Sequence, residues 1–336
     1  MKTPLFSIII PIYNGHNVIE RALNSIYSQG ITLEDFEVIC VDDCSPTMDS
    51  VDTINNYIWL DIHPTNLKII RHEVNKRQGG ARNSGVKAAC GQWIIYLDQD
   101  DMLVENSLLQ LKDKELFICN HDLIMLSHRI EDITKNTLVK DVYKNITNTK
   151  NMSGCEYLLN NPIGWAPWCY IYNRDFLLKN KLFFEENVRW EDLDYVMKAL
   201  LYASKMSFIP IEIYHYILEG QNTSFMRNDK DKIKDWFKMS IRVKKVAEDF
   251  IKINKDSAWV VMKHHIFHYS TAVKKTLWSL RYSDIYKILV EYKPYEKSGD
   301  KYLNFVIKHP RLYAAIAQFI RPILILGLWI RNKIRK

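Results

Sequence analysis

The sequence predicts an α/β protein with an open, mostly parallel sheet flanked by helices, followed by a helical C-terminal region. Two observations support this fold class. In roughly the first hundred residues, short apolar runs alternate with segments of helical periodicity, which is typical of strands alternating with helices. From about residue 229 onward, the apolar residues keep helical spacing alone. We therefore expect a sheet-containing domain over residues 1–225, a helical region over 226–300 and a tail over 301–336.

Each element is predicted from its own pattern. Four apolar runs are expected to form the strands 6–13, 36–43, 67–72 and 91–98, and the segments between them the helices 17–29, 47–60 and 79–90. Further along, 116–120 and 123–130 have the composition of strands, whereas the Pro, Gly and Trp residues of 161–177 indicate a loop that lines a pocket. The segment 190–203 begins with acidic residues, which suit the positive end of a helix dipole.

Aromatic and acidic residues collect where the predicted strands end. In open α/β sheets, ligands bind beyond the carboxyl ends of the strands. The residues expected at that edge are Pro11, Tyr13 and Asn14 from the first strand, Asp42 and Asp43 from the second, and Asp98 and Asp100 from the fourth. The sequence therefore predicts one crevice whose rim carries aromatic and carboxylate groups.

Two of these acids, Asp98 and Asp100, fall within four positions together with Asp101, and the three repel one another unless something neutralises them. The chain lacks a G-x-G-x-x-G fingerprint after the first strand, a P-loop and a G-x-S-x-G elbow. A phosphate-bearing ligand would then need a cation, and carboxylate oxygens suit Mg²⁺ or Mn²⁺. The alternative is a solvated turn in which one of the aspartates caps the next helix.

Four blocks of sequence, in this order, resemble the family 2 glycosyltransferases of the GT-A fold. They are "SIIIPIYNGHNVIERALNSIYSQ", "FEVICVDDCS", "GGARNSGVKAACGQWIIYLDQDD" and "VRWEDLDYV", and the resemblance covers roughly residues 5 to 225. It implies an inverting enzyme that uses a nucleotide-sugar donor. The second block departs from the family pattern, because Thr47 stands where relatives commonly carry an aspartate; Asp49 follows two residues later.

The resemblance also implies roles for individual residues. Asp43 would bind the uracil of a UDP-sugar, Asp98 would lie near the ribose, Asp100 would be the direct metal ligand, and Asp192 would be the general base with Glu191 beside it. The other residues implied in the nucleotide-sugar site are Pro11, Tyr13, Asn14, Asp42, Arg82 and Ser224, while Asp98 and His215 are further metal candidates. His215 and Ser224 belong to a segment, 213–224, that resembles the one closing over the diphosphate.

These residue types suit the transfer of a sugar. A divalent cation, Mn²⁺ or Mg²⁺, would stabilise the departing diphosphate, and a carboxylate can take the proton of an acceptor hydroxyl. A base opposite the leaving group implies one-step displacement with inversion. Two alternatives remain open: transfer to a polyprenyl phosphate, whose oxygen is already ionised, and a non-catalytic subunit that binds nucleotide sugars. Glu191 and Asp192 could also be ordinary first-turn acids of a helix.

The tail is basic and free of acid. Residues 301–336 contain eight Lys and Arg residues and no Asp or Glu, while the whole chain has a net charge of +7. The basic charge thus lies in one segment, and we expect no nucleic-acid partner. Arg321 and Pro322 interrupt the apolar run 312–330, so we expect a peripheral segment on the cytoplasmic face of the membrane rather than a span. This placement suggests a surface-polysaccharide or lipid-linked acceptor; the alternative is a helix packed on the protein body.

Two further motifs are open to more than one interpretation. His264 and His268 have the spacing of a metal site on a helix, but no acidic partner is evident, and a structural histidine cluster is the preferred interpretation. Trp165 and Trp168 can either stack on a sugar or pack inside the protein. The six cysteines include no C-x-x-C pair, and we expect reduced thiols.

Overall fold

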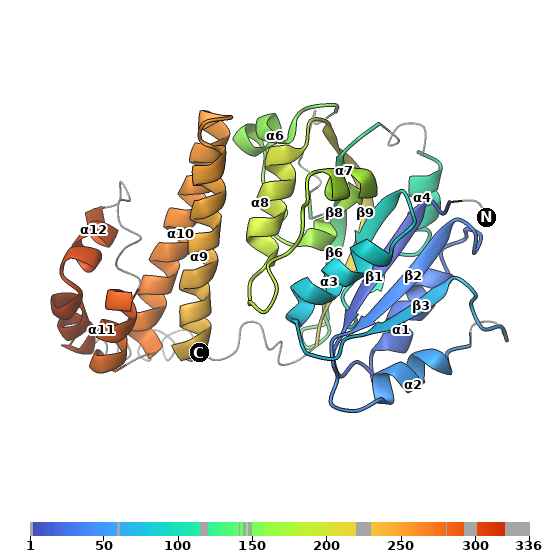
Figure 1. The fold of residues 1–336 in the computed structure, drawn as a ribbon, viewed down its shortest axis with the longest axis horizontal. Coiled ribbons are helices and arrows are strands. Elements are labelled where there is room, and N and C mark those ends of the chain that lie inside the picture. The colour runs from blue at the N-terminus through green and yellow to red at the C-terminus, as the bar shows by residue number, and fades with distance from the viewer. Residues whose placement is uncertain are drawn as a thin grey trace. The chain divides into compact units, whose positions relative to one another are not determined.

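The computed structural model describes most of the chain as two compact units, Met1–Thr223 and Ser224–Lys336 (Figure 1). The described residues are 3–58, 61–114, 120–140, 142–143, 146, 150–219, 230–279, 281–291 and 301–319. Each unit has its own apolar core. The first contains the sheet and the candidate site, and the second is helical.

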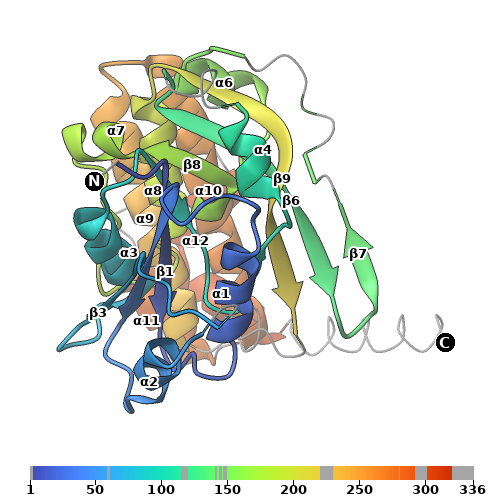
Figure 2. The same cartoon turned by 90° about the vertical axis from the view of Figure 1, so that its right-hand side faces the viewer.

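The first unit is built on a nine-stranded mixed sheet in the order β3-β2-β1-β4-β8-β6-β9-β5. Strand β7 pairs with β6, and Figure 2 shows it beside that strand. The strands are β1 (Phe6–Ile12), β2 (Phe36–Asp42), β3 (Leu67–Arg71), β4 (Trp93–Tyr96), β5 (Met102–Leu103), β6 (Leu123–Asp132), β7 (Thr137–Val139), β8 (Tyr170–Asn173) and β9 (Met206–Leu218). The first four pair in parallel, β8 is antiparallel to β4 and β6, and β9 is parallel to β6. The parallel half is the part that the alternating pattern predicted.

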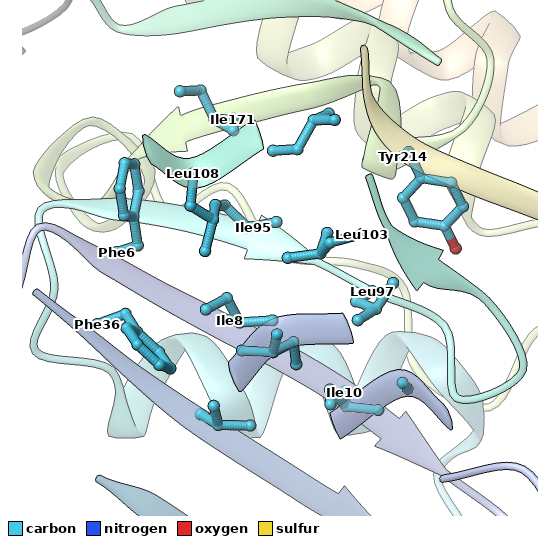
Figure 3. Packing of buried hydrophobic residues seen from close by; sticks show 14 of the residues in the cluster. Phe6, Ile8, Ile10, Phe36, Ile95, Leu97, Leu103, Leu108, Ile171 and Tyr214 are labelled. Carbon is cyan, nitrogen blue, oxygen red and sulfur yellow. The ribbon is translucent and has the colours of Figure 1, made fainter. Parts of the chain in front are cut away.

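Short helices accompany these strands. They are α1 (Ile19–Tyr27), α2 (Asp49–Asn55), α3 (Arg77–Ala88), α4 (Ser107–Lys112), α6 (Gly154–Asn160), the 3-10 turn η1 (Pro167–Cys169), α7 (Arg174–Lys179) and α8 (Asp192–Tyr202). Because elements cover the strands from both sides, β1 and β2 are buried along their whole length and carry continuous apolar runs. Figure 3 shows Phe6, Ile8 and Ile10 of β1 within this core. A Cβ atom on Gly85 would lie 2.3 Å from Ile9 Cγ2, so α3 packs directly on β1.

Two predictions about elements need correction, and one long strand was missed. The predicted helix 47–60 is shorter, because α2 ends at Asn55. The predicted loop 161–177 instead contains η1, β8 and the start of α7. The side chain of Asn173 caps α7, because it accepts a hydrogen bond from Phe176 N at 3.0 Å. The long strand β9 was not predicted. Most of the strand predicted at 116–120 lies outside the described residues.

The second unit consists of α9 (Lys230–Phe250), α10 (Lys255–Ser279), α11 (Tyr282–Glu291), α12 (Lys301–Lys308) and the helical residues 310–319. Its core includes Phe237, Tyr269 and Ile285 together with Val306 and Tyr313, which belong to the predicted tail. The first part of that tail thus packs in the unit's own core, as the packing alternative expects. Residues 320–336 lie outside the described part, and no helix among the described residues is long and apolar enough to cross a membrane.

Candidate active site

The candidate site lies beyond the carboxyl ends of β1, β2 and β4, where the chain holds the strand ends together. Asp43 N donates to Ile12 O at 2.8 Å, which joins the ends of β2 and β1. The side chain of Gln99, after β4, accepts from Tyr13 N at 2.9 Å and donates to Tyr13 O at 3.1 Å. The three strand ends predicted to meet at one edge of the sheet are therefore connected by hydrogen bonds.

A single buried cation, Arg82 of α3, joins three carboxylates from two distant parts of the sequence. Its Nη2 donates to Asp98 Oδ1 at 2.8 Å, and its Nη1 lies 2.7 Å from Asp192 Oδ1 and 3.2 Å from Glu191 Oε1. Only 1% of the Arg82 side chain is exposed. The structure thus brings the D-x-D segment and the acidic pair of "WEDLD" together around one guanidinium group.

The two acids of that pair have different surroundings. The side chain of Glu191 is 6% exposed and that of Asp192 is 36% exposed. Burial and repulsion by Asp192 raise the pKa of Glu191 to about 8, although Arg82 opposes this shift. Burial also raises the pKa of Asp192, with Arg82 again acting in the opposite direction. Glu191 therefore favours its protonated form at neutral pH, whereas Asp192 offers the accessible carboxylate.

The "GGARN" block fixes this geometry through close packing. A Cβ atom on Gly79 would lie 2.7 Å from Glu185 O, so only glycine lets α3 approach the 184–191 segment. Asn83 binds the backbone of Phe184 twice, accepting from its N at 2.8 Å and donating to its O at 3.0 Å. We did not predict a role for Asn83, although its place directly after Arg82 in the block was a signal.

A strained residue precedes the acidic pair. Trp190 has a φ of 61°, a left-handed conformation that is rare for a bulky side chain. Such strain persists where surrounding contacts hold it in place, and it clusters at functional sites. The backbone at Trp190 thus turns the chain so that Glu191 and Asp192 reach Arg82 at the start of α8.

The three clustered aspartates separate into two kinds. Asp101 is buried and points into the protein, where it accepts from Tyr214 Oη at 2.5 Å and from Ile217 N at 2.9 Å, both in β9. Burial and the neighbouring Asp98 raise the pKa of Asp101 to about 8. Tyr214 Oη also accepts from Asp98 N at 3.2 Å. Asp101 and Tyr214 therefore hold the loop that presents Asp98 and Asp100.

Asp98 and Asp100 fit a hard divalent cation that is shared with a phosphate ligand. One oxygen of Asp98 accepts a hydrogen bond from Arg82. Burial and repulsion by Asp98 raise the pKa of Asp100, and a bound cation would lower that pKa again. Among the described residues, no group of three or more His, Cys, Asp and Glu side chains could hold a metal by itself. Mg²⁺ is commonly held by one or two carboxylates plus substrate phosphates, and two carboxylates suffice for that arrangement.

His215 contacts a carboxylate of a neighbouring strand. It follows Tyr214 in β9, and consecutive side chains of a strand point to opposite faces. Its Nε2 lies 2.9 Å from Glu131 Oε2. In the strand pairing His215 lies opposite Met102, two residues after Asp100, and its expected role as a metal ligand stays a prediction.

The residues predicted around the nucleotide lie at the ends of β1 and β2. Pro11 is buried in β1, Tyr13 is 47% exposed, and Asn14 has a φ of 52° and donates its N–H to Ser45 Oγ at 2.9 Å. Asp42 is fully buried and bound to Ser45 and Arg71, so it organises the loop after β2. Asp43 is 3% exposed, and Ser224 lies outside the described residues.

The two tryptophans also differ. Trp168 stacks on Tyr214 with ring centroids 4.2 Å apart and an interplanar angle of 10°, and it also stacks on Tyr216. Trp168 therefore packs against the strand that holds Asp101. Trp165 is 44% exposed. In the second unit, His265 Nδ1 lies 2.7 Å from Ser240 O and is buried, which fits the structural interpretation of that histidine cluster.

Comparisons with known proteins agree with this geometry. Residues 7–137 match the family model described as glycosyl transferase family 2. The chain is 30% identical over 227 residues to the poly(ribitol-phosphate) beta-N-acetylglucosaminyltransferase TarS of Staphylococcus aureus, covering 65% of this chain and 37% of that protein. It is 27% identical to the putative glycosyltransferase EpsH of Bacillus subtilis, covering 64% and 61%.

The fold is shared with a solved structure. The crystal structure of S. aureus TarS 1-349 in complex with UDP superposes with a TM-score of 0.65 at 20% identity, covering 96% of this chain and 91% of that one. At this identity, the likeness shows the fold alone. The matched region spans little more than a third of the full-length TarS sequence, so the activity of that whole protein is not transferred to this chain by the match.

Proposed function

Because this chain belongs to glycosyl transferase family 2 and has the GT-A fold, we propose that it is an inverting enzyme that moves a sugar from a UDP-sugar to a hydroxyl group of a surface-polysaccharide or lipid-linked acceptor. The observation that carries the proposal is the Arg82 cluster, which joins Asp98, the residue expected beside the donor, to Asp192, the expected general base. The relative crystallised with UDP supports the choice of donor.

On the donor side, Asp98 and Asp100 would hold Mn²⁺ or Mg²⁺ together with the diphosphate. A divalent cation supplies Lewis-acid stabilisation to a leaving diphosphate. Asp43, at the end of β2, would accept a hydrogen bond from the uracil ring. Arg82 keeps Asp98 in place and partly neutralises the carboxylates around it, which limits their repulsion of the phosphates.

On the acceptor side, Asp192 would be the general base. Arg82 binds its Oδ1 and orients the carboxylate, and the raised pKa of Asp192 makes it a stronger base than an ordinary aspartate. The acceptor hydroxyl gives its proton to Asp192 while its oxygen bonds to the anomeric carbon. The bond from that carbon to the diphosphate breaks, and the electron pair leaves on UDP. One displacement from the opposite face inverts the anomeric centre.

Nucleotide binding tests the donor assignment. Isothermal titration calorimetry with UDP should show binding that is stronger with Mn²⁺ than with EDTA, and Asp100→Asn should lose this difference. Asp113→Asn, an exposed aspartate at the end of α4, is the matched control and should behave as wild type. The donor assignment fails if wild-type protein does not bind UDP, or if Asp100→Asn keeps the full Mn²⁺ effect.

Turnover separates the alternatives. Activity on a polyprenyl phosphate that survives Asp192→Ala would indicate transfer to an oxygen that is already ionised. UDP binding without turnover of any sugar in a panel of UDP-, GDP- and dTDP-sugars would indicate a non-catalytic binding subunit. The proposed function predicts turnover in wild-type protein and its loss in Asp192→Ala.

The proposal includes peripheral contact of the tail with the cytoplasmic face of the membrane. Support comes from the acid-free composition of 301–336 and from Phe305, Leu312 and Phe319, which recur every seven residues and are 39%, 50% and 80% exposed. Basic and apolar side chains on one segment suit an anionic lipid surface. The full chain should sediment with phosphatidylglycerol vesicles and much less with phosphatidylcholine vesicles. Equal partitioning, or none, would contradict this contact.

A further inference from the structure

Three residues from different elements form a continuous hydrogen-bonded chain beneath the end of β2. The Oδ1 atom of Asp43 lies 2.8 Å from His72 Nδ1, and His72 Nε2 lies 2.8 Å from Ser84 Oγ. Asp43 follows β2, His72 follows β3, and Ser84 belongs to α3. Asp43 is 3% exposed and His72 is 8% exposed. We call these residues the Asp43–His72–Ser84 chain.

The partners of this chain fix the orientation of the Asp43 carboxyl group. Its Oδ1 accepts from the backbone N of Lys76 at 2.8 Å as well as facing His72. The backbone on either side of the carboxyl is also held, since Asp43 N donates to Ile12 O and Asn75 Nδ2 donates to Asp43 O at 2.9 Å. Within the described part of the chain, no hydrogen bond to Oδ2 accompanies them, so Oδ2 is the atom left for a ligand.

The direction of the hydrogen bonds follows from the groups present. The backbone N–H of Lys76 can only donate, so Asp43 Oδ1 is the acceptor in that hydrogen bond. The same oxygen accepts from His72 Nδ1, which therefore carries the ring hydrogen. In a neutral ring, Nε2 is then an acceptor, and the hydroxyl of Ser84 donates to it. Asp43 Oδ1 therefore accepts two hydrogen bonds, and the second oxygen, Oδ2, is left to accept one from a ligand.

The same three residue types form the triad of serine hydrolases, but the surroundings of Ser84 do not suit that chemistry. A triad needs backbone or side-chain donors directed at the oxyanion that forms beside the serine. Ser84 lies in the interior of α3, where backbone N–H groups are used by the helix. The hydroxyl of Ser84 is thus placed to orient His72 rather than to attack a substrate.

We propose that His72 and Ser84 are positioning residues that make the base subsite selective for a nucleobase with a ring N–H donor, such as uracil, over cytosine, whose ring N3 is an acceptor. This proposal rests on the proposed function, which places the base at Asp43. A buried acceptor that is held rigidly rejects a ligand that cannot donate to it, because the acceptor is then left unpaired. His72 prevents the Asp43 carboxyl group from rotating to accommodate cytosine.

The ratio of two dissociation constants tests the proposal. UDP and CDP are titrated calorimetrically into the full chain with Mn²⁺ present. Wild-type protein should bind UDP roughly 100-fold more tightly than CDP, because leaving a buried acceptor unpaired costs a factor of about this order. His72→Leu should reduce this ratio by roughly tenfold or more, because Asp43 is no longer held as a fixed acceptor. His72→Asn, whose amide can still donate towards Asp43, should keep most of the ratio.

The outcomes are distinguishable. A ratio unchanged in His72→Leu, an equal loss of both affinities, or equal binding of UDP and CDP by wild-type protein would each overturn the proposal. Failure of wild-type protein to bind either nucleotide would overturn the proposed function instead. If His72→Leu does not fold, as judged by its melting temperature, Ser84→Ala makes the same comparison: a reduced ratio supports the chain, and an unchanged ratio contradicts it.

Discussion

The most demanding prediction concerns Arg82, a buried cation of the site. Replacing Arg82 with Met keeps a long unbranched side chain but removes the charge that binds Asp98, Glu191 and Asp192. Removing one partner of a buried ion pair typically costs about 3–5 kcal/mol, because the remaining charges lose their compensation. For a unit of this size, each kcal/mol corresponds to roughly 2–4 °C in the melting temperature. We therefore expect the first unit to melt roughly 6–20 °C lower.

The loss of unfolding free energy caused by Arg82→Met should also depend on pH. Carboxylates that have lost Arg82 can relieve their repulsion by taking up protons, and this becomes easier as the pH falls. The destabilisation should therefore be larger at pH 8 than at pH 5. Urea unfolding followed by tryptophan fluorescence at both pH values gives the two free energies of unfolding. The double variant Arg82→Met/Glu191→Gln should be less destabilised than the sum of the single variants, since the two residues interact directly.

A cation on the same helix provides the control. Lys87 is exposed, and its Nζ lies 5.4 Å from the centroid of the Phe183 ring. Lys87→Met should therefore change the free energy of unfolding by no more than about 1 kcal/mol. The reasoning would be refuted if Arg82→Met cost about as little as Lys87→Met, or if its cost were the same at pH 5 and pH 8.

Three further predictions follow from individual contacts. The pKa of Glu191 is raised to about 8 from an ordinary value of 4.5, so the folded state loses stability as the pH rises from about 5 to 8. The melting temperature of Glu191→Gln should therefore rise relative to that of the wild type across this range. A constant difference between the two melting temperatures would contradict this prediction. Arg77 is exposed and has a φ of 61°, a left-handed conformation that glycine adopts at less cost. Arg77→Gly should therefore raise the melting temperature by roughly 2–4 °C. A fall in the melting temperature would show that the left-handed conformation is not costly here. Tyr214→Phe should cost about 1–3 kcal/mol in urea unfolding, because Asp101 loses a buried donor; a change below about 0.5 kcal/mol would mean that this bond does not hold the loop.

The parallel half of the sheet could be predicted because local pattern determines it. In β1 and β2, nearly every residue is apolar, and both strands are buried along their length between covering layers. The antiparallel half was harder to predict, because its strands depend on distant partners. β8 is four residues long, and β9 reaches its full length through pairing with β6 and β5. Such context decides strands more than intrinsic preference does.

The grouping of the site residues was predictable where they stand in recognisable blocks, and less so where it depends on contacts between distant side chains. The acids Asp98 and Asp192 stand in recognisable blocks, and the structure joins them through Arg82. The metal role of His215 stays a prediction, because its printed contact is with Glu131 of β6 and strand pairing alone does not decide which ligand it meets. The roles of Tyr214 and His72 required knowledge of which side chains lie within hydrogen-bonding distance, and sequence spacing does not contain that information.

The central claim is that Asp192 removes the acceptor's proton in a displacement on a UDP-sugar. The most direct test compares wild-type protein and Asp192→Asn, which cannot act as a base but retains a similar shape. Both are titrated with UDP and then assayed for transfer from the donor sugar that wild-type protein turns over. We predict similar UDP affinities and a loss of transfer of about 10²–10⁴-fold in Asp192→Asn. Transfer within about tenfold of wild type, with UDP binding intact, would contradict the account.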